Sequence, residues 1–437
     1  MKVQYGKEIE VRVETDVFVA GGGPAGAAAA IAAARTGRRV FLAEAAGAFG
    51  GAGTVGLVPV FQRIGDGVNE LCAGIGKEII DRAYEGGAKD HEYFAINKEA
   101  LKRAYDGLIS EAGVEFRFMT NLIDVAVKAG EVEYVVLSDK SGVYAVKAKV
   151  YIDCTGDGDL CAFAGAEFEK GDENGQIMPS TLCSYWADID WDKFDMQYKH
   201  EQNIYVDDAY KKGILSVRDR HMPGITKVGA TLGGGNLGHA YDVDASDSAT
   251  VTRALLEQRR MLPEFENYFR TYWSGFEKAR LISTAEFLGI RASRRITGEY
   301  ILNIDDYMSR AVFDDEIGRY CYSVDIHPSK TDDESYQRFR NKFKGLWYKA
   351  GESYGIPYRI LTPKGLKNVL TAGRCVSTDN AMQASIRVMP GCYITGQAAG
   401  TAAALCAEYD CSVQSLDIKK LQARLVKDGA YLPNFSE

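Results

Sequence analysis

A glycine-rich turn near the start of the sequence constrains the fold more than any other feature. Residues 21–26 read GGGPAG and match the spacing G-x-G-x-x-G. A short apolar strand is predicted over residues 16–20 before this turn, and a helix of small residues over 27–36 after it. In that context the glycines allow a tight turn, close approach of the backbone to a pyrophosphate, and packing of the helix on the strand. The residues expected to line the phosphates are Gly21, Gly23, Pro24, Ala25 and Gly26.

The next segment extends this prediction along a dinucleotide. A second strand is predicted over residues 39–43, and it ends in Glu44, 18 residues beyond Gly26. At this distance a carboxylate accepts hydrogen bonds from the adenosine ribose. A second flexible loop follows at residues 49–54, where it would line the pyrophosphate and the chain that leads to the reactive ring. The binding candidates of this segment are Glu44, Ala45, Gly50, Gly51 and Thr54.

The middle of the chain alternates between helix and strand patterns. A helix is predicted over residues 97–112, with Asn97 as its N-cap. Segments near 114–127, 131–138 and 142–148 then read as an antiparallel meander. An apolar strand over residues 150–154 leads into three further binding candidates, which are Thr155, Gly156 and Asp157.

A helix near the C-terminus indicates which dinucleotide is bound. A strand is predicted over residues 368–372, followed by Gly373 and Arg374, and Gly391 introduces a long helix that ends near residue 409. The N-terminus of a helix stabilises negative charge through its dipole. A reduced flavin ring carries such a charge, whereas a reduced nicotinamide ring is neutral. The pattern therefore favours FAD over NAD.

Four stretches distributed along the chain resemble FAD-dependent oxidoreductases related to the fumarate reductase and succinate dehydrogenase flavoproteins. These stretches are residues 16–45, 151–171, 287–302 and 356–404. The resemblance implies an α/β fold of the glutathione-reductase type, with a Rossmann-like FAD-binding domain that contains a parallel sheet and a β-meander. It also implies an inserted α+β substrate or cap domain. We place the FAD-binding domain at residues 1–174 and 356–437, and the cap at 175–355.

The resemblance further implies where single residues lie along the cofactor. Leu122 would offer its backbone to the adenine, and Gly156 and Asp157 would lie along the edge of the cofactor. The residues expected toward the ribityl chain and ring are Arg374, Asp379 and Gly391. Many such flavoproteins carry an acidic ribityl ligand where this chain has Arg374, so Asp379 is expected to substitute. Residues 48–56 contain no histidine that could attach FAD covalently, so we expect noncovalent FAD.

A second glycine run fails the same test of context. Residues 233–238 also fit G-x-G-x-x-G, but no strong strand is predicted before them and no apolar helix follows. We therefore predict a glycine-rich loop in the cap and no separate NADPH domain. Elsewhere in the cap, helices are predicted near residues 246–272 and 277–289.

The cap is expected to supply the proton chemistry. Hydride transfer to or from a flavin needs an acid or base and groups that position the substrate. His239 follows the second glycine run, and His327 follows Asp325 by two residues. On a strand, Asp325 and His327 would share a face, and the carboxylate would raise the basicity of the imidazole. Ordinary core or surface positions are the alternative for both. The other histidines are His91, His200 and His221.

Arginines and a tyrosine complete the catalytic candidates. On a helix, Arg291 and Arg294 would share one side and could clamp a carboxylate. A solvated face, or pairing with Glu286 and Glu299, is the alternative for this pair. Tyr358 could donate a proton, and packing at the domain junction is its alternative.

Composition excludes several classes of protein. The chain has 437 residues and a formal net charge of −8, which argues against a nucleic-acid partner. Its longest apolar run is far shorter than the ~20 residues that a membrane span needs, and residues 1–15 contain no secretory apolar region. We therefore expect a cytoplasmic location. The nine cysteines form no C-x-x-C pair, so we expect reduced, mostly buried thiols and no metal centre.

These features lead to a functional hypothesis with open alternatives. We expect an enzyme in which hydride passes between flavin N5 and a small polar substrate that bears a carboxylate or a hydroxyl group. The arginines favour a carboxylate, whereas the histidines favour oxidation of a sugar or polyol. A non-catalytic flavin-binding subunit of a larger complex is a third hypothesis. The electron acceptor or donor and the oligomeric state, a homo-oligomer included, stay open.

Overall fold

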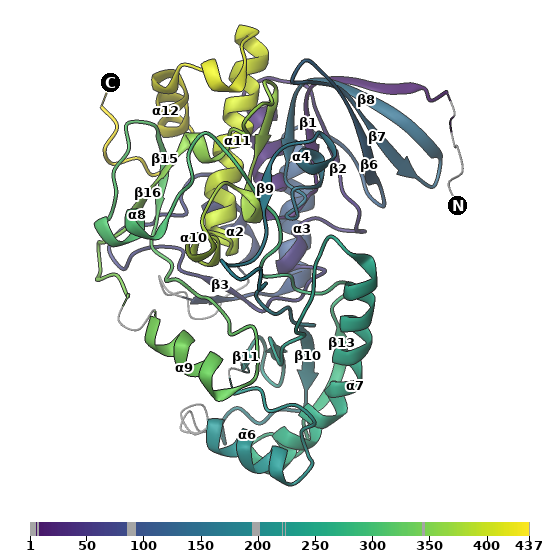
Figure 1. Ribbon diagram of the computed structural model, residues 1–437, viewed down its shortest axis with the longest axis vertical. Coiled ribbons are helices and arrows are strands. Elements are labelled where there is room, and N and C mark those ends of the chain that lie inside the picture. The colour runs from purple at the N-terminus through teal and green to yellow at the C-terminus, as the bar shows by residue number, and fades with distance from the viewer. Residues whose placement is uncertain are drawn as a thin grey trace.

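The computed structural model describes residue 6 and residues 8–84, 93–194, 202–220, 222, 224–342 and 346–436. Figure 1 shows two groups of elements along the longest axis of the molecule. Strands β6–β8 and helix α11 lie in the upper half, whereas α6, α7, β10 and β11 lie in the lower half. His91, His200 and His221 fall outside the described residues.

The upper half is built on a twisted mixed sheet. Its strand order is β5-β2-β1-β8-β7-β6, and β17 also pairs with β8. Strands β1, β2, β5, β17 and the second half of β8 run parallel, and β6–β7–β8 form an antiparallel meander. This sheet confirms the predicted α/β fold with a parallel sheet and a β-meander. The strands are β1 (Val11–Ala20), β2 (Val40–Ala43), β5 (Glu115–Arg117), β6 (Asn121–Lys128), β7 (Glu131–Asp139), β8 (Gly142–Asp153) and β17 (Val369–Thr371).

Two helices that are distant in sequence pack directly on each other and against this sheet. They are α1 (Pro24–Arg35) and α11 (Met389–Tyr409), and both are almost entirely buried. A Cβ atom at Gly396 would lie 2.2 Å from the carbonyl oxygen of Ala25, and one at Gly400 would lie 2.1 Å from that of Ala29. Only glycine allows this backbone contact, so the small-residue spacing on α11 fixes it against α1.

The C-terminal part of the chain thereby completes the N-terminal sheet. Strand β17 pairs with β8 through Thr371 opposite Asp153. At the end of β17, a Cβ atom on Gly373 would lie 3.0 Å from the Cβ atom of Ala25 in the first turn of α1. The two glycine-containing turns, one near each end of the sequence, therefore meet at one place.

A second hydrophobic core lies in the lower half. Its buried residues come from residues 182–288, together with Leu57. The antiparallel sheet β11-β12-β10-β13 contributes to this core, as do α6 (Gln202–Lys211) and α7 (Ser248–Tyr272). The strands are β10 (Ser184–Ala187), β11 (Ile225–Lys227), β12 (Gly233–Gly235) and β13 (Arg280–Thr284). The separate core is consistent with a cap, and the domain boundaries stay a prediction.

The remaining elements connect and cover these two cores. The helices are α2 (Ile75–Ala83), α3 (Lys98–Glu111), α4 (Asp159–Phe163), α8 (Ile304–Ser309), α9 (Asp333–Lys342), α10 (Asn380–Ile386) and α12 (Ile418–Lys427). The strands are β3 (Val60–Gln62), β4 (Tyr93–Ala95), β9 (Phe168–Glu169), β14 (Arg295–Ile296), β15 (Glu316–Tyr320) and β16 (Tyr354–Pro357). Short 3-10 turns are η1 (Gly51–Gly53), η2 (Tyr358–Ile360), η3 (Gly373–Cys375) and η4 (Val413–Ser415).

Two predictions about the upper sheet are corrected. Residues 114–127 do not form one meander strand, because β5 leaves to pair in parallel with β2 before β6 begins. Residues 142–148 and 150–154 do not form two strands, because no turn residue separates them. They form the single long strand β8, which pairs with β7 at its start and with β1 along its length.

Three predictions about the cap are also corrected. Residues 277–289 contain the strand β13 instead of a helix, because this segment pairs with β10 along the sheet. Arg291 and Arg294 lie in an irregular segment, so they share no helix face. The glycines at 233–235 are strand β12, where the absence of side chains allows contact: a Cβ atom at Gly233 would lie 2.3 Å from Ile225, and one at Gly234 would lie 2.3 Å from Pro59.

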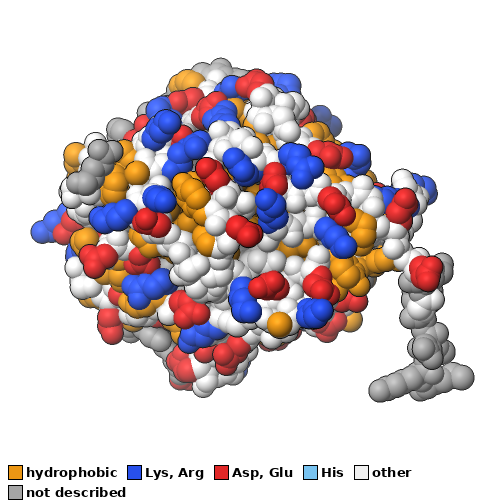
Figure 2. All heavy atoms as spheres, turned by 90° about the horizontal axis from the view of Figure 1, so that it is seen from above, with side chains coloured by type: hydrophobic (Ala, Val, Ile, Leu, Met, Phe, Trp, Pro, Cys, Tyr) orange, Lys and Arg blue, Asp and Glu red, His pale blue; other side chains and the backbone are white. Residues whose placement is uncertain are grey.

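The surface carries charges of both signs, and the cysteines are unpaired. The face in Figure 2 shows Lys and Arg interspersed with Asp and Glu. All nine cysteines are unpaired, and each is buried except Cys411, which is partly exposed. Among the described residues, no group of His, Cys, Asp and Glu is arranged to hold a metal ion. Within the same residues, no helix has the length and apolar character that crossing a membrane requires.

Candidate functional site

The first glycine turn forms a cradle in which each glycine has a different steric role. Gly21 has φ +90°, and a Cβ atom there would lie 2.6 Å from the Cys154 carbonyl oxygen. A Cβ atom at Gly26 would lie 1.7 Å from the Gly21 carbonyl oxygen. At Gly23, by contrast, a Cβ atom would meet nothing within 4 Å. The turn is therefore closed on the protein side and open at Gly23, where the motif brings a pyrophosphate against the backbone.

The start of α1 and the end of β2 supply the polar groups of this cradle. Gly23 is the N-cap of α1, Pro24 and Ala25 follow, and no side chain caps the helix. The first N–H groups of the helix are thus available to phosphate oxygens. The Glu44 carboxylate accepts from the N–H of Gly22 at 2.6 Å and from that of Ala46 at 2.7 Å. Burial raises the pKa of Glu44, while these N–H groups lower it.

The second loop lies between α3 and the start of α11. A Cβ atom at Gly50, where φ is +94°, would lie 2.4 Å from the Tyr105 ring. A Cβ atom at Gly53 would lie 2.8 Å from the sulfur of Met389, the first residue of α11. The Thr54 hydroxyl is buried and donates to the Phe49 carbonyl at 2.5 Å. Residues 50–54 therefore adjoin both the phosphate cradle and the N-terminus of α11.

Arg374 has a structural contact set that the sequence did not suggest. Its Nε donates to the Gly156 carbonyl at 2.9 Å and its Nη1 to the Ile290 carbonyl at 2.5 Å. Its Nη2 binds the Asp157 carboxylate at 2.6 Å. The guanidinium thus joins the turn after β8 to the segment after β13. Arg294 reinforces this junction, because it donates to the Asp157 carbonyl at 2.9 Å.

The other predicted binding residues lie along the same edge or form caps. Thr155 caps a turn by binding Asp153 through its hydroxyl at 2.7 Å. Asp379 is the N-cap of α10, and it accepts from Met382 N–H at 2.7 Å and from Ile304 N–H at 2.9 Å. Leu122 lies at the start of β6, Ala45 is exposed after Glu44, and Gly391 lies in the first turn of α11. Their predicted contacts with the cofactor stay predictions.

The N–H donors and the open backbone of this cradle fit a flavin dinucleotide. A family model identifies the family to which the chain belongs. The model for FAD dependent oxidoreductases matches residues 16–425. The chain belongs to this family. FAD is therefore its cofactor, and the protein is a flavoenzyme. The predicted FAD and oxidoreductase activity are confirmed at this level, while the substrate and the hydride step are not tested.

Solved structures with detectable similarity are distant from this chain. A geranylgeranyl bacteriochlorophyll reductase-like protein from Thermoplasma acidophilum is 14% identical, with a TM-score of 0.46, over 95% of this chain and 83% of its own. An anhydrotetracycline hydroxylase from Streptomyces rimosus is 13% identical, with a TM-score of 0.42, over 95% and 66%. A p-nitrophenol 4-monooxygenase from Pseudomonas putida is 12% identical, with a TM-score of 0.41, over 95% and 84%. No curated protein matches the chain.

The cap histidines form a buried hydrogen-bonded chain with two carboxylates. His239 Nδ1 lies 2.7 Å from Asp219 Oδ2, and His239 Nε2 lies 2.8 Å from His327 Nδ1. His327 Nε2 lies 3.4 Å from Asp325 Oδ2. Asp325 and His327 do not lie on a strand as predicted, but their predicted contact is present. The two histidines, which are 88 residues apart, are thus brought together.

The number of protons in this chain follows from the donors and acceptors. An ionised carboxylate can only accept, so its contact with an imidazole nitrogen is a hydrogen bond only when that nitrogen carries hydrogen. The contact between the two imidazoles needs one further N–H. The three contacts together need three N–H groups, whereas two neutral imidazoles carry two. All three contacts are therefore hydrogen bonds only when the pair holds one proton more than two neutral rings do.

Contacts from Arg387 and Tyr322 to Asp325 connect the chain to α11. Arg387 Nη2 donates to Asp325 Oδ2 at 3.1 Å, and the Tyr322 hydroxyl donates to the same oxygen at 3.2 Å. Arg387 is the C-cap of α10, directly before the N-cap of α11. The contact with Arg387 therefore places Asp325, at one end of the histidine chain, next to the N-terminus of α11.

Arg291 is a fully enclosed neighbour of this chain. It donates to the Pro179 carbonyl at 2.9 Å, to the Thr181 hydroxyl at 2.7 Å and to Asn236 Oδ1 at 3.0 Å. Burial and, next, the charge of Arg387 lower its pKa to about 10, so it stays protonated near neutral pH. Arg291 is thus present beside the histidines, but its Nη1 and Nη2 groups already bind protein acceptors.

Two candidates are directed elsewhere. Tyr358 is buried and donates to the Val413 carbonyl at 2.8 Å, a contact within the upper core. Arg294 binds Asp159 at 2.8 Å, in the junction described above. Sequence reasoning missed Asp219 and Tyr322, which are 20 residues before His239 and five before His327 and carry no motif.

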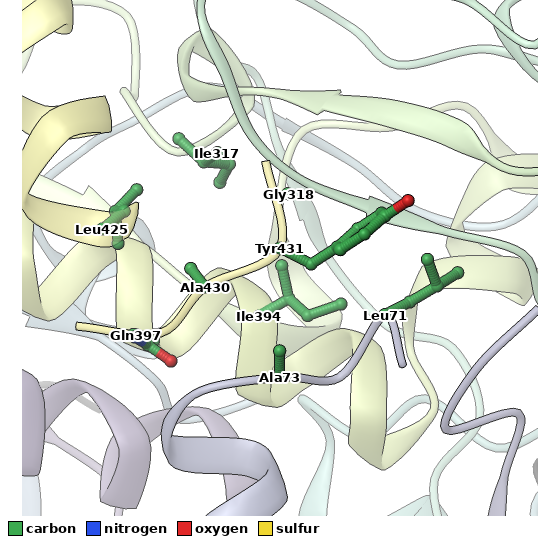
Figure 3. A pocket seen from close by; sticks show the side chains of 9 residues that line it. All are labelled: Leu71, Ala73, Ile317, Gly318, Ile394, Gln397, Leu425, Ala430 and Tyr431. Carbon is green, nitrogen blue, oxygen red and sulfur yellow. The ribbon is translucent and has the colours of Figure 1, made fainter. Parts of the chain in front are cut away.

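A small pocket elsewhere has a different character. It has about 240 Å³ of empty space, part of it open to solvent, and lies between α11, β15 and the C-terminal segment. Figure 3 shows Ile394 and Gln397 of α11 beside Ile317, Leu425 and Tyr431. The lining is mostly apolar and carries no charged side chain. We assign it to packing around the C-terminal segment.

Proposed function

We propose that this enzyme oxidises a hydroxyl group of a small polar substrate, and that the histidine pair receives the hydroxyl proton. The proposal is supported most by the chain Asp219–His239–His327–Asp325, which has an aspartate at each end and lies beside the α11 N-terminus. When bound, FAD would supply the two-electron acceptor for a hydride from the substrate carbon, at flavin N5. The chain's own residues then have to take up a proton.

The proton balance explains why the pair suits this task. A neutral pair has two N–H groups, so Asp219 and the contact between the rings leave a lone pair on His327 Nε2 near Asp325. The substrate O–H bond breaks and its proton binds this nitrogen, while the C–H bond breaks with both electrons leaving as hydride. The protonated pair then has three N–H groups, one for each of the three contacts. Product formation is thereby favoured by the same contacts.

The arginine contacts support a hydroxyl over a carboxylate as the reacting group. The resemblance to fumarate reductase relatives suggests a carboxylate clamp by Arg291 and Arg294. A clamp needs guanidinium N–H groups that face the substrate. Arg291 uses Nη1 and Nη2 on Thr181, Pro179 and Asn236, and Arg294 uses Nη1 on Asp157 and Asp159. These Nη groups are therefore directed at protein acceptors, and the Nε of Arg294 is buried without a hydrogen-bond partner.

The test is anaerobic reduction of the bound flavin. Purified holoenzyme is mixed with sugars and polyols in one series and with small carboxylic acids in another, and the flavin absorbance near ~450 nm is followed. We expect sugars or polyols to bleach this band. Bleaching by carboxylic acids alone would contradict the proposal and favour the clamp. If no compound bleaches the band and a second protein co-purifies, the subunit hypothesis replaces the proposal.

A further inference from the structure

One carboxylate on the surface of the cap holds two arginines at once. Asp207, on α6, accepts from Arg218 Nε at 2.7 Å and from its Nη2 at 3.0 Å. The same carboxylate accepts from Arg220 Nε at 3.2 Å and from its Nη2 at 3.1 Å. Each guanidinium therefore binds in the two-pronged geometry that fixes orientation as well as distance.

The residue between these two arginines in the sequence is Asp219, the aspartate of the histidine chain that contacts His239. Asp219 is 4% exposed and contacts His239, whereas Arg218 and Arg220 are 31% and 16% exposed along their side chains. Residues 218 and 219 belong to neither a helix nor a strand, so no backbone ladder fixes their position. The arginines on both sides of Asp219 are thus anchored at one point.

The contact of Asp207 with the two arginines is an ion-paired cluster that is partly exposed to solvent. The hydrogen bonds from Arg218 and then from Arg220 lower the pKa of Asp207 to about 2, against the opposing effect of burial. Asp333, in the first turn of α9, contacts both arginines and is 64% exposed. Asp219, His327 and Tyr241 contact His239. Asp207 instead binds Arg218 and Arg220, so its influence on His239 passes through the loop.

We propose that Asp207 is a positioning residue for His239, because its hydrogen bonds with Arg218 and Arg220 fix the loop that holds Asp219 against the imidazole. Asp219 in turn sets which nitrogen of His239 bears hydrogen: a carboxylate at Nδ1 requires an Nδ1–H, and this leaves Nε2 to accept from His327. The inference rests on the proposed function only for its kinetic readout.

The direct test measures the His239 tautomer in the full-length holoenzyme. The protein is labelled with ¹⁵N in its imidazole rings, and the His239 signals are assigned by comparison with His239→Gln. In Asp207→Ala we expect the Nδ1–H population of His239 to fall. We also expect the rate of substrate-driven flavin reduction to fall about tenfold, with little change in the substrate concentration at half-maximal rate. Asp207→Glu is expected to restore part of both.

A matched control separates positioning from general damage to the helix. Asp208 is the next residue on α6, and it binds Lys212 at 2.7 Å and the Tyr272 hydroxyl at 2.6 Å instead of the two arginines. We expect Asp208→Asn to leave the tautomer and the rate unchanged. If Asp207→Ala does not retain FAD, the milder Asp207→Asn is used in its place. An unchanged His239 tautomer in a folded Asp207 variant, or the same change in Asp208→Asn, would overturn the inference.

Because the tautomer is measured without substrate, the inference and the proposed function fail separately. A shifted tautomer with no turnover on any hydroxyl substrate would leave the positioning role intact and reject the substrate class. Normal turnover with an unaffected tautomer would reject the positioning role alone.

Discussion

The FAD cradle and the histidine chain of the cap both have a defined geometry, but different parts of the polypeptide determine it. The cradle is made of backbone, and its shape follows from glycines at 21, 23 and 26 that are neighbours in sequence. The histidine chain is made of side chains from residues 219, 239, 325 and 327, which lie in loops or beside strands of the cap. The cradle is thus encoded locally, whereas the histidine chain depends on tertiary packing.

The difference implies that the two regions respond differently to substitution. A change in the cradle alters backbone contacts, so it affects FAD binding and folding together unless the added atoms point into open space. A change in the histidine chain alters a few polar contacts on a preformed scaffold. It is therefore expected to affect the reaction while FAD stays bound.

The largest effect is expected from Gly26→Ala. The added Cβ atom would lie 1.7 Å from the Gly21 carbonyl oxygen, so the strand–turn–helix unit has to move. We expect a loss of about 3 kcal/mol in the free energy of unfolding and no retained FAD. Thermal melting and the flavin absorbance per protein measure both. A variant with normal stability and a full complement of FAD would contradict the steric account of the cradle.

Gly23→Ala tests the cradle without disturbing its packing. Its Cβ atom would meet nothing within 4 Å, so the fold should tolerate the change. The same atom occupies the space that a pyrophosphate needs, so we expect FAD affinity to fall about 10- to 100-fold. Titration of the apoprotein with FAD gives the affinity, and melting of the apoprotein is the control. Equal affinities for the variant and the original protein would place the phosphates elsewhere.

His327→Gln tests the cap side of the comparison. Glutamine keeps a polar side chain but cannot take the proton, so we expect flavin reduction to slow about 10²- to 10⁴-fold with FAD content unchanged. Stopped-flow reduction by a substrate from the hydroxyl series measures the rate. Slowing of less than about threefold would show that the histidine pair is not the proton acceptor.

The smallest effect is expected in the acid stability of the cap. The pKa of Asp207 is lowered to about 2 in the folded protein, below its ordinary value of 3.8. Its contribution to stability is therefore fully present above pH 4 or so and is lost as the pH falls toward about 2. Because the carboxylate is partly exposed, we expect less than about 1 kcal/mol. The melting temperatures of the original protein and Asp207→Asn should converge as the pH falls from 5 to 2, and a constant gap would contradict this linkage.

The same contrast explains how much could be predicted from the sequence. The motif at 21–26, the Asn97 cap of α3 and the long helix α11 follow from local propensities and were predicted. The strand β13 was predicted as a helix, because only its pairing with β10 makes it a strand. Similarly, the glycines of β12 were predicted as a loop, because the packing of Ile225 and Pro59 against them lies outside their local sequence.

The candidate site shows the same limit at the level of single residues. His239, His327 and Arg291 could be selected from the sequence by residue type, but the contact between the two histidines could not. Asp219 carries no motif, and its role depends on the loop that Arg218 and Arg220 anchor. Arg374 was expected near the ribityl chain, yet its guanidinium binds Gly156, Asp157 and Ile290. Such contacts depend on the complete fold.

The most direct measurement of the central claim is proton uptake during a single anaerobic turnover. A weakly buffered solution with a pH indicator is mixed with holoenzyme and a hydroxyl substrate, and the indicator and flavin signals are followed together. If the histidine pair receives the substrate proton, the flavin bleaches before the proton appears in solution, and in His327→Gln the bleaching slows. If the proton appears in solution at the rate of bleaching in the original protein, and His327→Gln bleaches equally fast, the histidine pair is not the acceptor.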